Sequence, residues 1–176
     1  SEAFPPKANP PLAEAREDEI LLQAFTCNAA ANPILWSGLK PIYVDVDEKT
    51  FNMDVEDLSR KITTKSRAVM VQHTFGLPAD MDEIMEICRE NKLILIEDCA
   101  HALGATYSST GASTELSRMS SSQVRGKKLG TFGKAAFFSF SRDKIISSVY
   151  GGIAVTDDDE LAKRFLEYQE KIGYPS

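Results

Sequence analysis

The chain has few residues of the kinds that bind metals or form disulfides. Its 176 residues include two histidines and three cysteines. Neither His73 nor His101 has a histidine or cysteine at a ligand spacing, and the cysteines form no Cys-x-x-Cys pair. A structural zinc site is therefore not expected. The odd number of cysteines instead predicts reduced thiols in a cytoplasmic protein.

The sequence also has no apolar run of membrane-spanning length and no basic leader followed by an apolar stretch. Both absences predict a soluble protein with no membrane partner. The net charge is −6, and the nearest approach to a basic patch is the short segment 125–128. Nucleic acid is therefore not an expected partner. A hydrophobic content of 43% is sufficient for one globular core.

The most informative stretch is an apolar run that ends in acidic residues. Residues 93–96 are rich in branched side chains and do not alternate with polar residues, which predicts a parallel strand covered on both faces. Glu97 and Asp98 follow at its carboxyl end, where open α/β sheets bind ligands. Taken alone, Asp98 is equally consistent with capping of the turn that follows.

A second strand-like segment also ends in polar residues. The aromatic run 137–140 leads into a hydroxyl-rich turn and then Lys144. An amine held at a strand end can be desolvated, which lowers its pKa and allows it to attack a carbonyl. A carboxylate can keep a pyridine nitrogen protonated and so make the ring an electron sink. Asp98 and Lys144 together therefore predict a site for pyridoxal 5'-phosphate.

Short apolar strands alternate with amphipathic helices along the chain, which predicts a three-layer α/β/α fold with a mostly parallel sheet. Strands are expected over residues 19–25, 41–47, 67–73, 93–96 and 153–156. Helices are expected over residues 29–37, 55–62, 80–91 and 159–172. Asp80 is expected to cap the third helix, and Trp36 is expected to pack in the core.

Four polar residues fall at or just after the ends of the predicted strands. They are Thr26, His73, Asp98 and Ser139. Because parallel strands end at one edge of a sheet, these side chains are expected to lie close together. For His73, a role in orienting its turn is as consistent with the sequence as a catalytic one.

Four motifs, in this order, resemble the DegT/DnrJ/EryC1/StrS family of sugar aminotransferases. They span residues 41–47, 73–80, 96–105 and 138–152. The resemblance extends from Glu19 to Gly173. It implies the large domain of a fold-type-I pyridoxal phosphate transferase and a homodimer. It also implies transfer of an amino group from an amino acid donor to a nucleotide-linked keto-sugar.

The resemblance also implies a role for each of five residues. Lys144 corresponds to the lysine that holds the cofactor and carries protons, and Asp98 to the acid that keeps the ring protonated. His101 stands where the family places Gln or His near the ring hydroxyl. Ser139 corresponds to a phosphate-contacting serine. Cys27 stands where the family usually carries an aromatic that stacks on the ring.

The sequence predicts an irregular amino-terminal segment followed by one domain. Residues 1–18 are expected to be irregular or short-helical, and residues 19–176 to form the cofactor-binding large domain. A Ser/Thr-rich inserted loop is expected at about 108–126. Compared with the family, the Gly-Thr phosphate segment and the small carboxyl-terminal domain are expected to be absent.

Two other functions remain open at this stage. A shortened, non-catalytic binding or structural domain is indicated by the absent Gly-Thr segment, by Cys27, and by Lys134 at a position where the family usually has Asp. A sugar dehydrase of the same fold is the other alternative. That branch typically replaces the lysine by histidine, so Lys144 argues against it.

Overall fold

The computed structural model describes residues 17–108 and 126–173, and its elements alternate as the sequence predicts. The strands are β1 (Glu19–Gln23), β2 (Lys40–Val44), β3 (Ser66–Gln72), β4 (Ile94–Asp98), β5 (Thr106–Tyr107), β6 (Lys127–Lys128), β7 (Ala135–Ser139) and β8 (Gly152–Val155). The helices are α1 (Asn28–Trp36), α2 (Val55–Lys61), α3 (Met81–Glu90) and α4 (Asp159–Ile172), with a 3-10 turn η1 (Thr74–Gly76). Within these described ranges, no helix combines the length and apolarity needed to cross a membrane.

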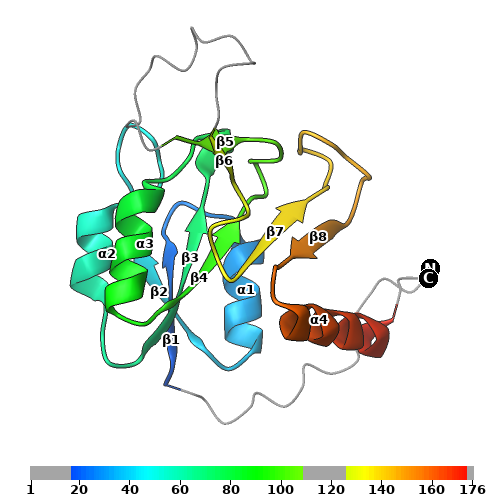
Figure 1. Cartoon of the computed structure of the whole chain (residues 1–176), viewed down its shortest axis with the longest axis horizontal. Coiled ribbons are helices and arrows are strands. Elements are labelled where there is room, and N and C mark those ends of the chain that lie inside the picture. Colours follow the sequence, from blue (N-terminus) through cyan, green and yellow to red (C-terminus); the bar gives the residue numbers. More distant parts are fainter. Residues whose placement is uncertain (1–16, 109–125, 174–176) are drawn as a thin grey trace, which may run out of the picture.

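The main sheet has the order β2-β1-β3-β4-β7-β8 (Figure 1). Every neighbouring pair from β2 to β7 is parallel, and β8 runs antiparallel to β7 at the edge. The prediction of a mostly parallel sheet is therefore confirmed. β5 and β6 form a separate antiparallel ribbon.

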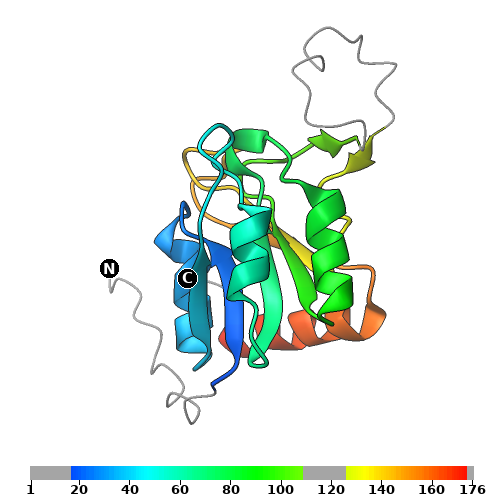
Figure 2. The same cartoon turned by 90° about the vertical axis from the view of Figure 1, so that its left-hand side faces the viewer.

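Helices cover both faces of the sheet, because strand side chains alternate between two apolar clusters (Figures 1 and 2). On one face, Leu21 and Val69 pack with buried residues of α2 and α3 such as Leu58 and Ile84. On the other face, the strand neighbours Ile20, Leu22 and Ala68 pack with Ala31 and Ile34 of α1. The three-layer arrangement predicted from the sequence is thus confirmed.

The helix starts show how short side chains set element boundaries. Asp54 precedes α2 and its carboxylate accepts a hydrogen bond from the Asp57 N–H at 2.7 Å. Asp158 does the same for α4, accepting from the Leu161 N–H at 2.9 Å. Asp80 occupies the corresponding position before α3, but its side chain makes no capping hydrogen bond. The prediction of a side-chain cap at Asp80 was wrong in this respect.

Trp36 is not in the core, contrary to the sequence-based prediction. Its side chain is 54% exposed, whereas Ile34 is 5% exposed. Residues two apart on a helix point in nearly opposite directions, so α1 cannot bury both against the sheet. The small and branched residues Ala30, Ala31 and Ile34 form the packed stripe instead.

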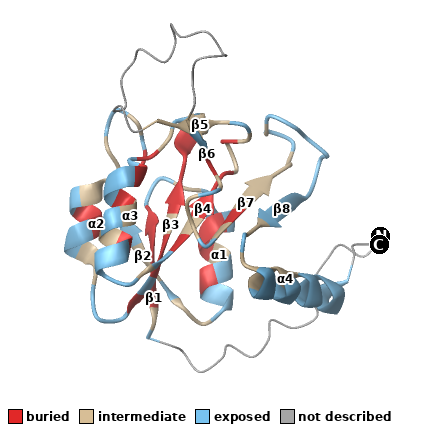
Figure 3. Cartoon of the chain, viewed as in Figure 1, coloured by how far each residue is buried: buried red, intermediate tan, exposed pale blue. Residues whose placement is uncertain are grey.

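The apolar side chains of the last helix, α4, are not buried. α4 begins and ends where the sequence predicts, yet none of its residues is buried. Figure 3 shows it largely in the exposed colour, beside the equally exposed strand β8. Leu166, Tyr168 and Ile172 are each at least 60% exposed. The expectations for residues 1–16 and for the insertion at 109–125 lie outside the described residues.

Candidate active site

The predicted site residues come from the carboxyl ends of adjacent parallel strands, toward the top of Figure 1. Asp98 is the last residue of β4 and lies in register with Gln72 of β3 and Phe137 of β7. Thr26, which follows β1, donates a hydrogen bond from Oγ1 to Oε1 of Gln72 at 2.6 Å. The expected convergence of strand ends at one edge of the sheet is therefore present.

Lys144 and His101 are in direct contact at this edge. The lysine Nζ lies 3.0 Å from the histidine Nε2, and the lysine side chain is only 13% exposed. Since an amine donates, Nε2 accepts and a neutral ring then carries its hydrogen on Nδ1. That Nδ1 is buried and has no hydrogen-bond partner among residues 17–108 and 126–173. The pair thus includes a buried donor that these residues do not use.

Asp98 is 4% exposed and close enough to Lys144 to interact with its charge. Burial raises the pKa of its carboxyl, and a hydrogen bond from the Ala100 N–H at 2.9 Å, together with the positive charge of Lys144, opposes that rise. A buried carboxyl in this state gains stability from an added cationic N–H donor.

A second acid holds Lys144 from the solvent side. Asp143 accepts hydrogen bonds from the Lys144 amine at 2.9 Å and from the Ser141 hydroxyl at 2.8 Å. These hydrogen bonds lower the pKa of Asp143 to about 2. Asp143 is therefore ionised at neutral pH and, with His101, fixes the position of the lysine amine.

Ser139 and Cys27 are less closely tied to this group. Ser139 ends β7, and its hydroxyl lies 3.3 Å from the hydroxyl of Ser141, so two hydroxyls gather beside the lysine turn. Cys27 is an exposed residue at the start of α1. In the part of the chain that the structure describes, no hydrogen bond joins its thiol to Asp98, His101 or Lys144.

Phe75 is a site residue that the sequence did not reveal. Its ring stacks on His101, with ring centroids 5.8 Å apart and planes inclined by 12°. It also contacts Phe25, which contacts Phe51 in turn. Phe75 and Phe51 have φ values of 54° and 58°. Bulky residues rarely adopt this left-handed conformation, which a sequence pattern does not signal.

Glu97 is the second residue that the sequence left without a role. It neighbours Asp98 on β4 and is fully buried, and its carboxylate accepts hydrogen bonds from His73 and from the backbone N–H groups of Gly130, Phe132 and Gly133. Burial alone would raise its pKa, but these hydrogen bonds outweigh burial and lower it. The sequence signals for Glu97 were its place at the carboxyl end of a buried strand and the two glycines, Gly130 and Gly133, that precede β7.

His73 has a structural place in this arrangement. Its Nδ1 accepts a hydrogen bond from the Ala79 N–H at 3.2 Å, so its ring hydrogen is on Nε2 and is donated to Glu97. His73 therefore orients the turn that contains Phe75. Together with Cys99, His73 and Glu97 form a cluster of metal-ligand types within 4.8 Å. Hydrogen bonding and burial, which raises the pKa of the Cys99 thiol, account for this cluster without an ion.

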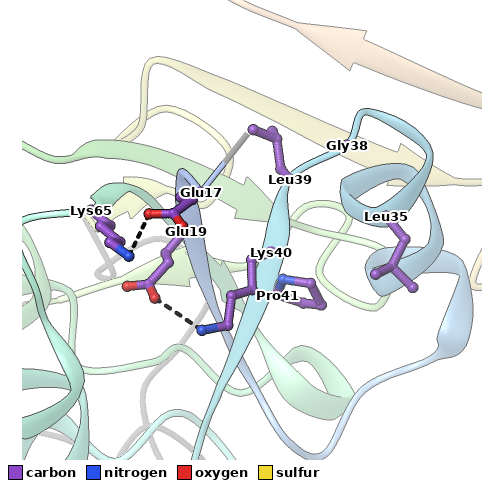
Figure 4. A pocket seen from close by; sticks show the side chains of 8 residues that line it. All are labelled: Glu17, Glu19, Leu35, Gly38, Leu39, Lys40, Pro41 and Lys65. Atoms are coloured by element: carbon purple, nitrogen blue, oxygen red, sulfur yellow. Dashed lines mark hydrogen bonds and ion pairs between the residues drawn. The ribbon is translucent and has the colours of Figure 1, made fainter. Parts of the chain in front are cut away.

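A surface cavity of about 360 Å³ lies at the opposite end of the strands, away from this site (Figure 4). Its charged side chains pair with one another. Lys65 contacts Glu17 at 2.6 Å, and Lys40 contacts Glu19 at 3.3 Å. The cavity therefore offers a ligand little uncompensated charge, and the chemistry of the chain is concentrated at the other edge.

The fold of the chain is shared with solved aminotransferases. An aminotransferase from Psychrobacter cryohalolentis matches with a TM-score of 0.76 and 31% identity, over 90% of this chain and 36% of that one. The fold is thus that of the large domain of fold-type-I pyridoxal phosphate transferases.

Sequence comparison then assigns the family. The family model described as the DegT/DnrJ/EryC1/StrS aminotransferase family matches residues 9–172, and the chain belongs to this family. It is 38% identical over 152 residues to a GDP-perosamine synthase of Escherichia coli O157:H7, covering 86% of this chain and 37% of that protein. A GDP-perosamine synthase of Caulobacter vibrioides is 40% identical over 147 residues, covering 84% and 35%. The chain spans little more than a third of the length of these relatives.

Proposed function

We propose that this domain binds pyridoxal 5'-phosphate through Lys144 and serves an aminotransferase that converts a nucleotide-linked keto-sugar to an amino-sugar. The observation that carries the proposal is the group formed by Lys144, His101 and the buried Asp98. Its unused donor, acid and amine match three parts of the cofactor, and the family membership agrees with that match.

The residues present fit the cofactor. Asp98 would pair with the pyridine N–H, which relieves the cost of a carboxylate that burial disfavours. The unpartnered Nδ1 of His101 would donate to the ring oxygen. The hydroxyls of Ser139 and Ser141 would contact the phosphate, and Cys27 would offer a small apolar face near the ring. When bound, pyridoxal phosphate supplies an electron sink for chemistry at the carbon next to nitrogen.

The chain's own residues supply positioning and proton transfer. The Lys144 amine is held 3.0 Å from Nε2 of His101 and 2.9 Å from the Asp143 carboxylate, and in this fixed position its nitrogen would take up and return a proton. Asp98 would keep the pyridine nitrogen of the bound cofactor protonated. His101 fixes the direction in which the lysine amine points.

Substrates and partners follow from the relatives and from the surface. Two relatives are GDP-perosamine synthases, so we assign a nucleotide-linked keto-sugar as acceptor and an amino acid such as glutamate as donor. A homodimer is proposed because large apolar side chains next to Lys144 are exposed: Ile145 by 69%, Ile146 by 59% and Tyr150 by 74%. Nucleotide-sugar metabolism and three free cysteines agree with a cytoplasmic location.

The test is covalent trapping of the cofactor. Purified protein is mixed with pyridoxal phosphate, the visible absorbance band is recorded, and borohydride reduction is followed by peptide mapping. The label is expected on Lys144 in the wild type and in Lys92→Ala, which removes an exposed lysine, and should vanish in Lys144→Ala. Labelling scattered over surface lysines would favour the non-catalytic alternative.

Protein loaded with pyridoxal phosphate, and not treated with borohydride, is then tested for the two half reactions. Glutamate should be converted to 2-oxoglutarate, and a nucleotide-linked 4-keto-6-deoxy sugar should then gain an amino group, both detected by mass spectrometry. Deoxygenation of the sugar in place of amination would support the dehydrase alternative. Cofactor labelling without either half reaction would limit the function of this chain to cofactor binding.

A further inference from the structure

Glu97 connects three segments behind the site. Its Oε1 accepts hydrogen bonds from the N–H groups of Phe132 at 2.6 Å and Gly133 at 2.7 Å. Its Oε2 accepts from the Gly130 N–H at 2.8 Å and from Nε2 of His73 at 3.3 Å. The side chain is fully buried. Each oxygen therefore serves two donors, a capacity that an amide with one oxygen cannot match.

The first connection leads to Lys144 through the turn after β3. His73 donates to Glu97, accepts from the Ala79 N–H, and donates its own N–H to the carbonyl of Asp98 at 3.2 Å. These bonds fix both ends of a turn that holds Phe75 at a φ of 54°. Strained backbone of this kind persists only where its surroundings enforce it. Phe75 then stacks on His101, whose Nε2 accepts from Lys144.

The second connection fixes the segment that leads into β7. A side-chain carbon on Gly133 would lie 2.6 Å from the carbonyl oxygen of Leu95, and one on Gly130 would lie 2.7 Å from the ring of Phe138. Both glycines thus allow a close approach of backbone to β4 and β7, and Glu97 satisfies the N–H groups that this approach buries. β7 ends at Ser139, five residues before Lys144.

We propose that Glu97 is a positioning residue that holds the pair His101 and Lys144 in the geometry needed to take the cofactor. It acts from behind the site, through the turn that carries Phe75 and through residues 130–133. The assignment to cofactor binding rests on the function proposed above. The effect on the geometry of Lys144 does not, because it concerns the chain alone.

The decisive variant is Glu97→Gln, compared with Glu86→Gln, which alters an exposed glutamate on α3. The protein without cofactor is acetylated under conditions in which its lysines compete for the reagent. The acetylation rate of Lys144 is then divided by the acetylation rate of Lys92, an exposed lysine before β4. Pyridoxal phosphate affinity is measured by absorbance at a temperature at which circular dichroism shows each variant folded. In Glu97→Gln we expect a relative acetylation rate about threefold or more higher and an affinity about tenfold or more weaker. Glu86→Gln should leave both unchanged.

A second variant, Phe75→Gly, tests the same connection without a buried change. Glycine favours the φ of this position, and the Phe75 side chain is 66% exposed, so the thermal midpoint should be kept or raised. Loss of the stack on His101 should nevertheless increase the relative acetylation rate of Lys144. If Glu97→Gln does not fold, Phe75→Gly shows whether the turn that carries Phe75 positions Lys144.

Two outcomes would overturn parts of this account, and they can be told apart. If folded Glu97→Gln and Phe75→Gly both acetylate Lys144 at the wild-type relative rate, Glu97 stabilises the core and positions nothing. If the wild type does not bind pyridoxal phosphate but the acetylation rates differ as expected, the positioning role stands and the proposed cofactor function fails.

Discussion

The amine of Lys144 lies 3.0 Å from Nε2 of His101, and the opposite ring nitrogen of His101 is buried without a partner in the described part of the chain. One ring therefore does two things at once, since it accepts from the lysine and keeps a donor available on its far side. An orphaned buried donor is costly, and a bound acceptor removes that cost.

Replacement of His101 should weaken cofactor binding according to the donor that remains. His101→Leu removes the N–H and should weaken pyridoxal phosphate affinity by about tenfold or more, the value of one hydrogen bond to a charged group. His101→Gln retains an N–H donor and should lose less. Absorbance titration of both folded variants measures this, and equal losses would show that the hydrogen bond is not what matters.

Asp98→Asn should stabilise the cofactor-free protein at neutral pH while weakening cofactor binding. Burial raises the pKa of Asp98, so between its unfolded and folded pKa the native state binds more protons than the unfolded state. Stability is therefore lost as the pH rises through that interval, and the asparagine variant avoids the loss. Thermal midpoints should be a few degrees higher than wild type at pH 7 and equal at acidic pH below the unfolded pKa. A lower midpoint at pH 7 would contradict the burial argument.

Asp57→Asn should have the opposite effect on stability. The Asp45 N–H and then Lys61 and Arg60 lower the pKa of Asp57 from its ordinary 3.8 to about 2. This stabilisation is present above the unfolded pKa and is lost as the pH falls through the folded value, and it corresponds to about 2 kcal/mol at pH 7. Urea unfolding at pH 7 and pH 3 should show the difference shrinking with acid. Glu56→Gln, an exposed neighbour, is the control.

The amphipathic helices α3 and α4 should respond differently to truncation of an apolar side chain. Ile84 on α3 is fully buried, and Ile84→Ala should cost about 2 to 5 kcal/mol of unfolding free energy. Leu166 on α4 is 60% exposed, and Leu166→Ala should change it by less than about 0.5 kcal/mol. Similar costs in urea unfolding would mean that α4 is packed in solution.

The sequence predicted the structure best for the buried strands and for the polar residues at their ends. Strands such as 67–73 and 93–96 were recognisable because buried parallel strands need continuous apolar residues, and the strand ends followed from the polar residues Asp98 and Ser139. Asp98 and Ser139 could be placed at the same edge because parallel strands share an edge. His101 and Lys144 follow these two strand ends by three and five residues and are in contact, and their chemical roles remain predictions.

The features that the sequence did not provide depend on contacts between distant segments. The left-handed backbone of Phe75 and its stack on His101 arise from a turn fixed by Glu97, and no local pattern encodes them. The exposure of Trp36 depended on which face of α1 meets the sheet. Glu97 itself looked like an ordinary strand-end acid until its four donors were located.

The order of strands in the sheet sets the order in which the site can be assembled during synthesis. β1, β3 and β4 are neighbours and lie within residues 19–98, so they can pair before β7 is made. β7 then adds beside β4 and brings Lys144, the last of the proposed site residues to leave the ribosome. A nascent chain stopped before β7 would carry Asp98 and His101 but no attachment point, so covalent capture of the cofactor would mark a chain in which all five parallel strands of the sheet have been made.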